Sequence, residues 1–347
     1  MDCKKKTLIA LFLLIALTFQ GCRTASKRSH GSGIYPKAVT TTLKGRADEC
    51  GIWADPKDPK KTVLIGNDKS STGALYVWNL DGELIFQTPP IDQPVGVSIR
   101  YGVPLGKNEK VDIVACGVRS TNEIKIFKID KNTRQLIDLT TEGGISTEFP
   151  DKTYGLCLYK RSSDGQLFAF VSRKETDNIH QVQIDHDGKG KFKGTLVRKF
   201  GGRNLRTFVE GMVADDEHGY LYCSDERYAI LKFWADPKIR KDPYIRKFGV
   251  ADNIRGDREG LGLYRKKMGK GYLVVSSQGD SSFKIYNREG KNKFIKSINL
   301  PGVTKTDGIG ITPLSIPPKY PNGIFAAHND KDNNYVLFDW YEFSRLQ

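Results

Sequence analysis

The sequence predicts an all-β protein with the architecture of a six-bladed β-propeller. A three-strand pattern recurs six times: a first strand opening on a small or polar residue, an apolar second strand with a polar end, and a third strand. First strands recur at intervals of 57, 56, 49 and 48 residues, marked by Ser98, Gly155, Gly211, Gly260 and Gly308. This spacing is typical of propeller blades. The sequence shows no long amphipathic periodicity, so we expect no extended helices.

The strands can be assigned in order along the six repeats. The first strands begin at Cys50, Val97, Tyr154, Glu210, Glu259 and Asp307. The second strands begin at Val63, Val111, Leu167, Gly219, Gly271 and Gly323, and the third are ALYVWNLDG, IKIFKID, IHQVQID, AILKFW, FKIYNREG and YVLFDW. Turns with Asp-Gly or Glu-Gly, such as 80–83 and 288–291, are expected between third and fourth strands, because tight hairpins need positive φ.

The first 21 residues are interpreted as an export signal. Lys4–Lys6 form a positive segment, and Thr7–Phe19 form an apolar segment too short for a confident membrane span. The Gly-Cys pair that ends at Cys22 resembles the cleavage site of a bacterial lipoprotein, and a plain secretory signal is the alternative. The expected domains are therefore a signal over 1–21, a flexible tether over 22–37 and the propeller over 38–347.

These assignments predict an exported protein at the periplasmic or extracellular face, anchored to a bacterial membrane only by a lipid on Cys22. The net charge of +15 would attract anionic ligands, whether nucleic acid, membrane or phosphorylated small molecules, and the alternative is that the many lysines are solvated loop residues without a ligand. Acids in the predicted cleft would repel a nucleic-acid backbone, so we expect no nucleic acid as a partner. We expect a monomer that binds a small phosphate ester.

The globular part contains four cysteines. They are Cys50, Cys116, Cys157 and Cys223. An exported protein permits disulfides, but three of these residues fall on strands of different blades without CxxC spacing. Buried free thiols are therefore expected, and a zinc site is not supported.

Acidic residues recur where the blades should converge. The first strand of each blade lines the channel of a propeller, so residues at one strand end meet there. The acids concerned are Asp48, Glu49, Glu210, Asp225, Glu226, Asp257, Glu259 and Asp307. Several carboxylates together suit Ca²⁺ better than zinc or copper. A half ring of acids would repel itself without counter-ions, so solvent exposure alone explains it poorly.

Basic residues occupy the same rim in the first three repeats. Lys69, Arg119 and Lys174 end second strands, and Tyr154 could add a phenolic donor. Arginine forks match phosphate oxygens, and lysine supplies a compact charge. Structural ion pairs with neighbouring acids are the alternative. The combination indicates a rim that binds cations and several phosphates of one ligand.

With these motifs the chain resembles the β-propeller phytases, also called alkaline or 3-phytases. The resemblance covers nearly all of the chain after the tether. Its motifs are 48–56, 111–119, Tyr154-Gly155, Lys174-Glu175, EGMVADDEHGYLY, Asp257–Leu261, GKGYLVVSSQGDSS, IYNREGKNK, Thr306–Ile309 and KYPNGIF. So many matches in order are specific, whereas a single Asp-Gly or Glu-Gly would mean nothing.

The resemblance implies a phytase that depends on several calcium ions. Such an enzyme removes phosphate from phytate (myo-inositol hexakisphosphate) through attack by a metal-activated water. The implied calcium ligands are Asp48, Glu175, Glu210, Glu226, Asp257, Glu259 and Asp307, with Glu49 and Asp225 added as adjacent acids. The implied phosphate-binding and catalytic residues are Lys69, Arg119, Tyr154 and Lys174, and Glu175 and Glu226 are also assigned to catalysis.

The chain departs from the family pattern in two places. Asp48-Glu49-Cys50-Gly51 replaces the usual Asp-Asp-Pro-Ala, and the acidic pair of the fourth blade is altered to Asp225-Glu226. Two other functions stay open. One is a non-catalytic propeller that binds a polyanion or a protein, and the other is a different metal-dependent six-bladed hydrolase such as a lactonase. A lactonase site does not need basic residues, so Lys69, Arg119 and Lys174 argue against this function.

Overall fold

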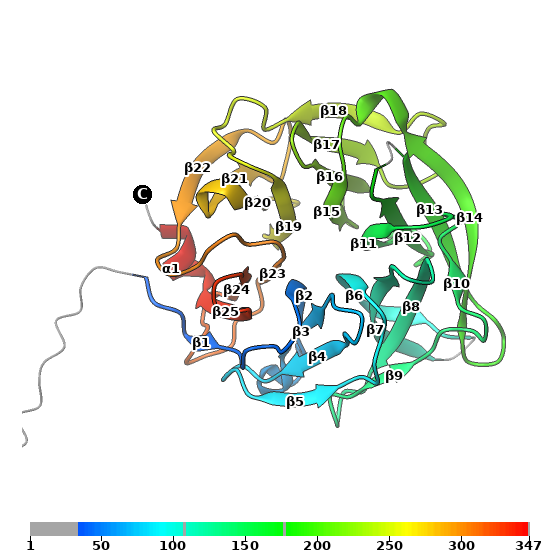
Figure 1. Cartoon of the computed structure of the whole chain (residues 1–347), viewed down its shortest axis with the longest axis horizontal. Coiled ribbons are helices and arrows are strands. Elements are labelled where there is room, and N and C mark those ends of the chain that lie inside the picture. The colour runs from blue at the N-terminus through cyan, green and yellow to red at the C-terminus, as the bar shows by residue number, and fades with distance from the viewer. Residues whose placement is uncertain (1–33, 107–108, 176–177, 346–347) are drawn as a thin grey trace, which may run out of the picture. The chain divides into compact units, whose positions relative to one another are not determined.

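The computed structural model describes residues 34–106, 109–175 and 178–345, and these form six antiparallel sheets around a central axis (Figure 1). The predicted signal peptide, Cys22 and the tether up to residue 33 lie outside the described residues. The predicted six-bladed β-propeller is confirmed. Each sheet is a blade, and the blades are numbered 1 to 6 in chain order.

The blades share one order of strands from the axis outward. Blade 1 contains β2 (Ala47–Trp53), β3 (Val63–Asp68), β4 (Leu75–Trp78) and β5 (Leu84–Gln87). Blade 2 contains β6 (Pro94–Pro104), β7 (Lys110–Val118), β8 (Glu123–Ile129) and β9 (Leu136–Asp138), and β10 (Ile145–Ser146) also pairs with β8. Blade 3 contains β11 (Thr153–Lys160), β12 (Leu167–Arg173), β13 (Asn178–His186) and β14 (Phe192–Gly201).

The second half repeats this order. Blade 4 contains β15 (Val209–Asp215), β16 (Tyr220–Asp225), β17 (Ala229–Trp234) and β18 (Tyr244–Phe248). Blade 5 contains β19 (Arg258–Arg265), β20 (Gly271–Ser277), β21 (Ser282–Asn287) and β22 (Phe294–Asn299). Blade 6 contains β23 (Ile309–Thr312), β24 (Ile324–Asn329) and β25 (Asn334–Asp339), and its outermost strand is β1 (Ala38–Val39).

Helices are few and short in the described residues, as the sequence predicts. There is one α-helix, α1 (Trp340–Arg345), and there are three 3₁₀ turns at Pro59–Lys61, Gly202–Asn204 and Gln278–Asp280. No helix of the described part is long and apolar enough to cross a membrane.

The ring is closed by a strand from the beginning of the propeller. Strand β1 pairs antiparallel with β25, and the register places Ala38 opposite Leu337. Tyr335 on β25 also joins blade 6 to blade 1, because its hydroxyl donates to the carbonyl oxygens of Glu49 and Asn67. Both ends of the described propeller are therefore held in the last blade, so the ring cannot open without breaking a sheet.

The apolar core is divided among the interfaces between neighbouring blades. The cluster between blades 2 and 3, for example, contains Ile113, Ile126, Leu158 and Val182, and five similar clusters lie between the other neighbours. Burial of these faces stabilises the ring by roughly 25 cal/mol per Å² of apolar surface. The four cysteines are buried free thiols, as predicted.

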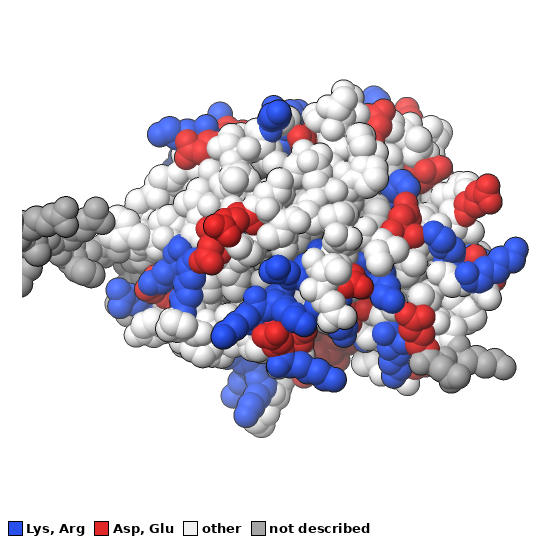
Figure 2. Space-filling view, turned by 90° about the horizontal axis from the view of Figure 1, so that it is seen from below, with Lys and Arg blue, Asp and Glu red and all other residues white. Residues whose placement is uncertain are grey.

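The surface carries charges of both signs. In Figure 2, Lys and Arg side chains lie beside Asp and Glu over the face that is shown. Many of these contacts are ion pairs between exposed or half-exposed groups, such as Lys128 with Glu109 and Lys319 with Asp81. Exposed pairs of this kind contribute little to stability, about 0–1 kcal/mol each.

Candidate active site

The innermost strands direct polar side chains to the axis through β-bulges. Five of the six innermost strands (β2, β6, β11, β15 and β19) have a register shift near their first residues. A bulge interrupts strict alternation and re-aims side chains, which is why bulges are common beside active sites. The residues within or beside these shifts are Asp48, Val95, Tyr154, Glu210 and Glu259. In blade 6 the corresponding acid, Asp307, lies two residues before β23.

In most blades a glycine follows the polar residue at the bulge. The innermost strand of the next blade lies so close there that a side chain would not fit. A Cβ on Gly211 would lie 2.1 Å from the carbonyl oxygen of Glu259, and one on Gly260 would lie 2.5 Å from that of Asp307. In blade 2 this position belongs to Gly96, which faces Leu156 of blade 3, and not to Ser98 as the sequence spacing suggested. Blade 1 is the exception, because it has Glu49 there.

A second ring of residues follows the second strands. Each of its members donates its backbone N–H, at 2.8–3.1 Å, to a carbonyl ahead of the innermost strand of the same blade, which in blades 1 to 5 belongs to the residue directly before that strand and in blade 6 to Thr304, five residues before β23. The six members are Lys69, Arg119, Lys174, Glu226, Gln278 and Asp330. This bond fixes the same backbone position in every blade, so the side chains of the six residues start from equivalent places around the axis.

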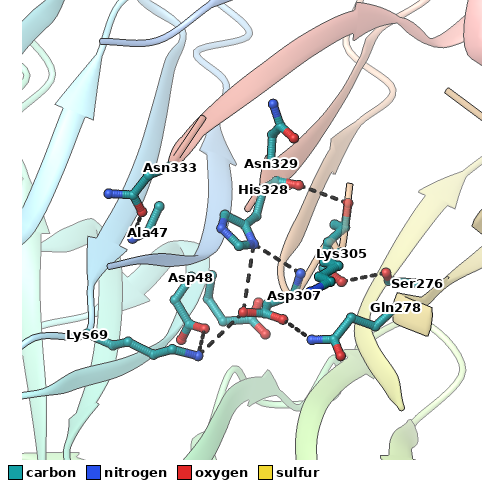
Figure 3. Close-up of polar contacts among 12 residues, drawn as sticks. Ala47, Asp48, Lys69, Ser276, Gln278, Lys305, Asp307, His328, Asn329 and Asn333 are labelled. Carbon is teal, nitrogen blue, oxygen red and sulfur yellow. Dashed lines mark hydrogen bonds and ion pairs between the residues drawn. The ribbon is translucent and has the colours of Figure 1, made fainter. Parts of the chain in front are cut away.

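Acids cluster around Lys69: Asp48 of blade 1 and Asp307, which leads into blade 6, are shown in Figure 3, and Glu210 of blade 4 adds a third. The Lys69 ammonium forms ion pairs with Asp48, with Asp307 Oδ2 at 3.4 Å and with Glu210 Oε1 at 3.9 Å. Gln278 Nε2 donates to Asp307 Oδ1 at 2.5 Å. His328 Nδ1 accepts from the Asp307 backbone N–H at 3.1 Å. Lys69 is therefore an ion-pair partner of the acids and not a free base.

One lysine does not neutralise all of these acids. Burial is the largest single effect on Asp48 and would raise its pKa, but the charge and hydrogen bond of Lys69, together with His328 and Asn67, lower the pKa overall. Burial raises the pKa of Glu210 to about 8, with Asp48 as the next cause. The pKa values of Glu49, Glu259 and Asp307 are also raised, first by burial and then by neighbouring carboxylates. The cluster thus has more negative charge than its own cation balances.

Three of the glutamates converge closely. Glu210, Glu226 and Glu259 each place one carboxylate oxygen within 4.8 Å of the others. Several buried acid oxygens have no hydrogen-bond partner among the described residues, namely Asp48 Oδ2, Glu210 Oε1, Glu226 Oε1 and Glu259 Oε2. Buried carboxylate oxygens without partners are unfavourable unless a cation binds them. This arrangement fits a metal site with oxygen ligands.

The basic side of the site is organised around the Tyr154 ring. The Arg119 guanidinium lies 5.1 Å from the ring centroid and the Lys174 ammonium lies 5.0 Å from it. Burial, followed by the charge of Glu210, raises the pKa of Tyr154, so the hydroxyl stays protonated. Arg119 Nε donates to the Thr153 carbonyl at 3.2 Å, while its buried Nη2 has no partner among the described residues. That amino group is available to an anionic ligand.

Three further residues of the predicted site lie elsewhere. Asp225 is buried, and its carboxylate accepts from the backbone N–H groups of Arg206 and Thr207 at 2.6 and 3.0 Å, so it fixes the preceding loop. Asp257 pairs with Arg227 at 3.1 Å at the rim. Glu175 is exposed and pairs with Lys152 at 2.7 Å. Of the three, Asp257 still acts on the cluster, because its charge raises the pKa of Glu226.

Gln278 and Asp330 were not among the residues predicted for the site, whereas the sequence places His328 at a blade-channel position with a neutral hydrogen-bonding role. Gln278 and Asp330 follow the second strands of blades 5 and 6, at the positions of Lys69 and Glu226. An alignment of the second-strand ends across all six repeats would have identified both. The structure identifies the partner of His328, which is the backbone N–H of Asp307, 21 residues earlier in the chain.

Comparisons with known proteins agree with this geometry. The sequence profile of the family described as Phytase matches residues 5–337. A 3-phytase of Bacillus subtilis (strain 168) is 35% identical over 316 residues, which is 86% of this chain and 80% of the relative.

Two solved propellers were also matched by structure. The β-propeller domain of Myceliophteria thermophila Cps50 (Swd1) covers 86% of this chain and 99% of its own, with 11% identity and a TM-score of 0.49. The WD40 β-propeller domain of Doa1 covers 90% of this chain and 99% of its own, with 13% identity and a TM-score of 0.49. On the family profile and the Bacillus relative, the chain belongs to the phytase family of enzymes, as its sequence predicted.

Proposed function

We propose that this enzyme releases phosphate from phytate and requires several calcium ions. The observation that carries the proposal is that Tyr154 has on one side an arginine with a buried amino group that has no hydrogen-bond partner, and on the other the glutamates whose buried oxygens have none. An enzyme that acts on a molecule with several phosphates needs carboxylates and basic groups. The carboxylates bind metal cations, and the cations together with the arginine bind the phosphate groups. The Bacillus relative is named a 3-phytase, which supports phytate as the substrate.

The donor set supports calcium as the metal. Glu210, Glu226 and Glu259 offer hard oxygen atoms at close range, and Asp48 and Asp307 extend the set toward blades 1 and 6. Calcium accepts six to eight oxygen ligands in a flexible geometry. Among the described residues the four free cysteines lie in the apolar clusters, so they offer no sulfur ligand set for a softer metal.

When bound, calcium supplies positive charge that offsets the charge of the substrate phosphates and of the group being transferred. The protein residues then have separate tasks. Arg119 Nη2 and Lys174 bind phosphate oxygens from one side, and Tyr154 supplies a neutral hydroxyl donor. Lys69 orients Asp48 and Asp307, since its ammonium contacts both.

Phosphate release from phytate, measured with calcium and with a chelator, tests this function. We expect activity in calcium and none in excess chelator, and Glu210→Gln should lose at least about a hundredfold in kcat/KM because it removes a buried ligand. Glu109→Gln is the matched control, because Glu109 is exposed and pairs only with Lys128 at the surface. Full activity in chelator would exclude the calcium requirement, and no phosphate release under any condition would exclude phytase activity.

We further propose that the mature enzyme is an exported monomer, held at a bacterial membrane by a lipid on Cys22. The support is the sequence around that cysteine, which lies outside the described residues. Nucleic acid is not proposed as a partner, because the unpartnered groups of the site are mainly carboxylates.

A further inference from the structure

The central channel carries opposite charge at its two ends. The innermost strands run from the acidic site to the opposite face, so β19 begins next to Glu259 and ends on Arg265. One cavity of about 200 Å³ follows this axis, with Glu49 and Glu210 near the acidic end and Arg100 and Arg265 toward the other. We call the part beside the two arginines the lower channel.

The charge of Arg100 is balanced within the protein. Its Nε lies 2.8 Å from Asp216 Oδ2, and its Nη2 donates to Asp216 Oδ1 at 3.1 Å. Nη2 also donates to the carbonyl oxygen of Ala214 at 3.2 Å, and Nη1 donates to that of Ile99 at 2.8 Å. Nη2 also donates to the Leu158 carbonyl oxygen of blade 3, so Arg100 reaches from blade 2 to blades 3 and 4 and forms a fixed, neutralised part of the lower channel wall.

The charge of Arg265 is not balanced. In residues 34–106, 109–175 and 178–345 it has no ion pair, and its one hydrogen bond is a long contact of 3.4 Å from Nη2 to the Ala214 carbonyl oxygen. The nearby acids are already used, since Asp216 pairs with Arg100 and Asp215 pairs with Arg288. The remaining donors of the Arg265 fork therefore face the cavity that this side chain lines.

The two guanidinium groups are also neighbours. Arg100 and Arg265 donate to the same Ala214 carbonyl oxygen, at 3.2 and 3.4 Å, from blades on different sides of the axis. Burial and the charge of Arg100 both lower the pKa of Arg265. Two adjacent cations with one carboxylate between them leave an uncompensated positive charge in a polar cavity, and such a charge favours an anion.

We propose that the lower channel binds one small tetrahedral oxyanion, inorganic phosphate or sulfate, against Arg265 with Arg100 as the second cation. The arginine fork matches the spacing of two oxygens of such an ion. The acidic end of the cavity repels an anion and so confines it to the lower channel. This site is separate from the proposed catalytic site, and none of its arginines contacts the calcium ligands.

Calorimetric titration of the full chain with sulfate and with phosphate, in chelator, tests this site. We expect wild type to bind one ion of either kind, and Arg265→Gln to weaken binding at least about tenfold, because a charge-assisted fork is lost. Arg119→Ala is the control for the opposite face and should retain this binding. A preference for phosphate would point to the reaction product as the ligand, and equal binding would indicate a general oxyanion site.

Two results would overturn the proposal: equal affinity of wild type and Arg265→Gln, or binding lost in Arg119→Ala alone. If Arg265→Gln does not fold, Arg265→Lys tests the same point. Lysine keeps the positive charge but lacks the two-pronged guanidinium group, so this variant should bind the oxyanion with intermediate affinity. Crystals soaked in selenate should show one anomalous peak beside Arg265, and a peak only at the acidic face would contradict the assignment. Arg265→Gln should release phosphate from phytate within about twofold of wild type, because Arg265 lies outside the catalytic residues.

Discussion

The carboxylate of Glu49 lies against the backbone of Gly308, where blade 1 meets blade 6. A Cβ on Gly308 would lie 2.7 Å from Glu49 Oε2 and 2.4 Å from Glu49 Cα. The Gly308 N–H also donates to the Asp48 carbonyl at 3.0 Å. The first and last innermost strands therefore meet through a contact that admits no side chain at Gly308, and this contact positions Asp48 and Glu49 in the site.

Gly308→Ala should therefore separate the two strands. We expect a loss of about 1–3 kcal/mol in the free energy of unfolding, because an added methyl group overpacks this junction. Calcium affinity should fall as well, since Asp48 and Asp307 flank the displaced backbone. Urea unfolding and calcium titration measure both effects. Ser162→Ala, at an exposed position, is the control, and unchanged stability of Gly308→Ala would contradict the contact.

Glu259→Gln should change stability in opposite directions with and without metal. Burial, followed by the charges of Glu210, Asp307 and Glu226, raises the pKa of Glu259; in chelator the substitution replaces this carboxyl with a neutral amide and removes the cost of burying it, so Tm should rise by roughly 2 °C. In calcium the same substitution removes a ligand, so Tm should fall below that of wild type. A change of the same sign in both conditions would show that Glu259 does not contact the metal.

Arg119→Lys tests the phosphate-binding role of the unpartnered guanidinium group. Lysine keeps the positive charge, but it has a single ammonium group. It cannot donate to the Thr153 carbonyl oxygen as Arg119 Nε does and at the same time offer a second donor in place of Nη2. We expect kcat/KM for phytate to fall about tenfold or more, with Tm unchanged. Arg240→Lys, an exposed substitution in the loop between β17 and β18, should have no effect. Equal kinetics of the two variants would show that Arg119 is structural.

The buried ion pair of Asp215 and Arg288 predicts a loss of stability in acid. Burial would raise the pKa of Asp215, but two bonds from Arg288, at 2.5 and 2.7 Å, lower it to about 2. A lowered carboxyl pKa stabilises the fold at pH above the unfolded value of about 3.9, and this stabilisation is lost as pH falls toward 2.

Asp215→Asn should thus destabilise the enzyme at pH 7 by up to about 3–5 kcal/mol, because it removes the fully buried carboxylate partner of Arg288 and leaves only the half-exposed carboxylate of Glu217. The difference from wild type should shrink between pH 5 and pH 2 in chemical unfolding experiments. Asp81→Asn, which alters a surface pair with Lys319, should show a small difference at every pH. A difference for Asp215→Asn that does not change with pH would exclude this linkage.

Cys22→Ser tests the proposed anchor. We expect the wild-type protein in the membrane fraction of a bacterial host and the variant in the soluble exported fraction, because a lipid on Cys22 is the only strong attachment that the sequence predicts. Fractionation followed by detection of the propeller measures the partition. Identical partition of the two proteins into the soluble fraction would leave a plain secretory signal as the interpretation.

The sequence predicted the architecture because propeller repeats are local. Blades 1 to 5 and the three inner strands of blade 6 are continuous segments, so the strand pattern, the six repeats and the buried free thiols could all be identified along the chain. The repeats also predicted that acids at equivalent positions would meet at the axis. The structure brings five of them to one end of the channel, namely Asp48, Glu210, Glu226, Glu259 and Asp307.

Tertiary structure decided what each of these side chains contacts. Asp225 and Glu226 are adjacent in sequence, but Asp225 bonds to a loop backbone while Glu226 joins the glutamate cluster, because alternate residues at a strand end point in different directions. Glu175 follows Lys174 yet lies on the surface with Lys152. Gln278 contacts Asp307 across 29 residues, a partnership that composition and spacing do not encode.

The closure of the ring and the charge of its channel also depend on the fold. Strand β1 pairs with β25, almost the full length of the propeller away, and brings Glu49 against Gly308. Arg100 and Arg265 meet at one carbonyl oxygen although they belong to blades 2 and 5. Sequence periodicity determined which residues face the axis. Only the closed ring determined which of those residues are neighbours across it, because that depends on the angle between blades and on the bulges that turn their first residues inward.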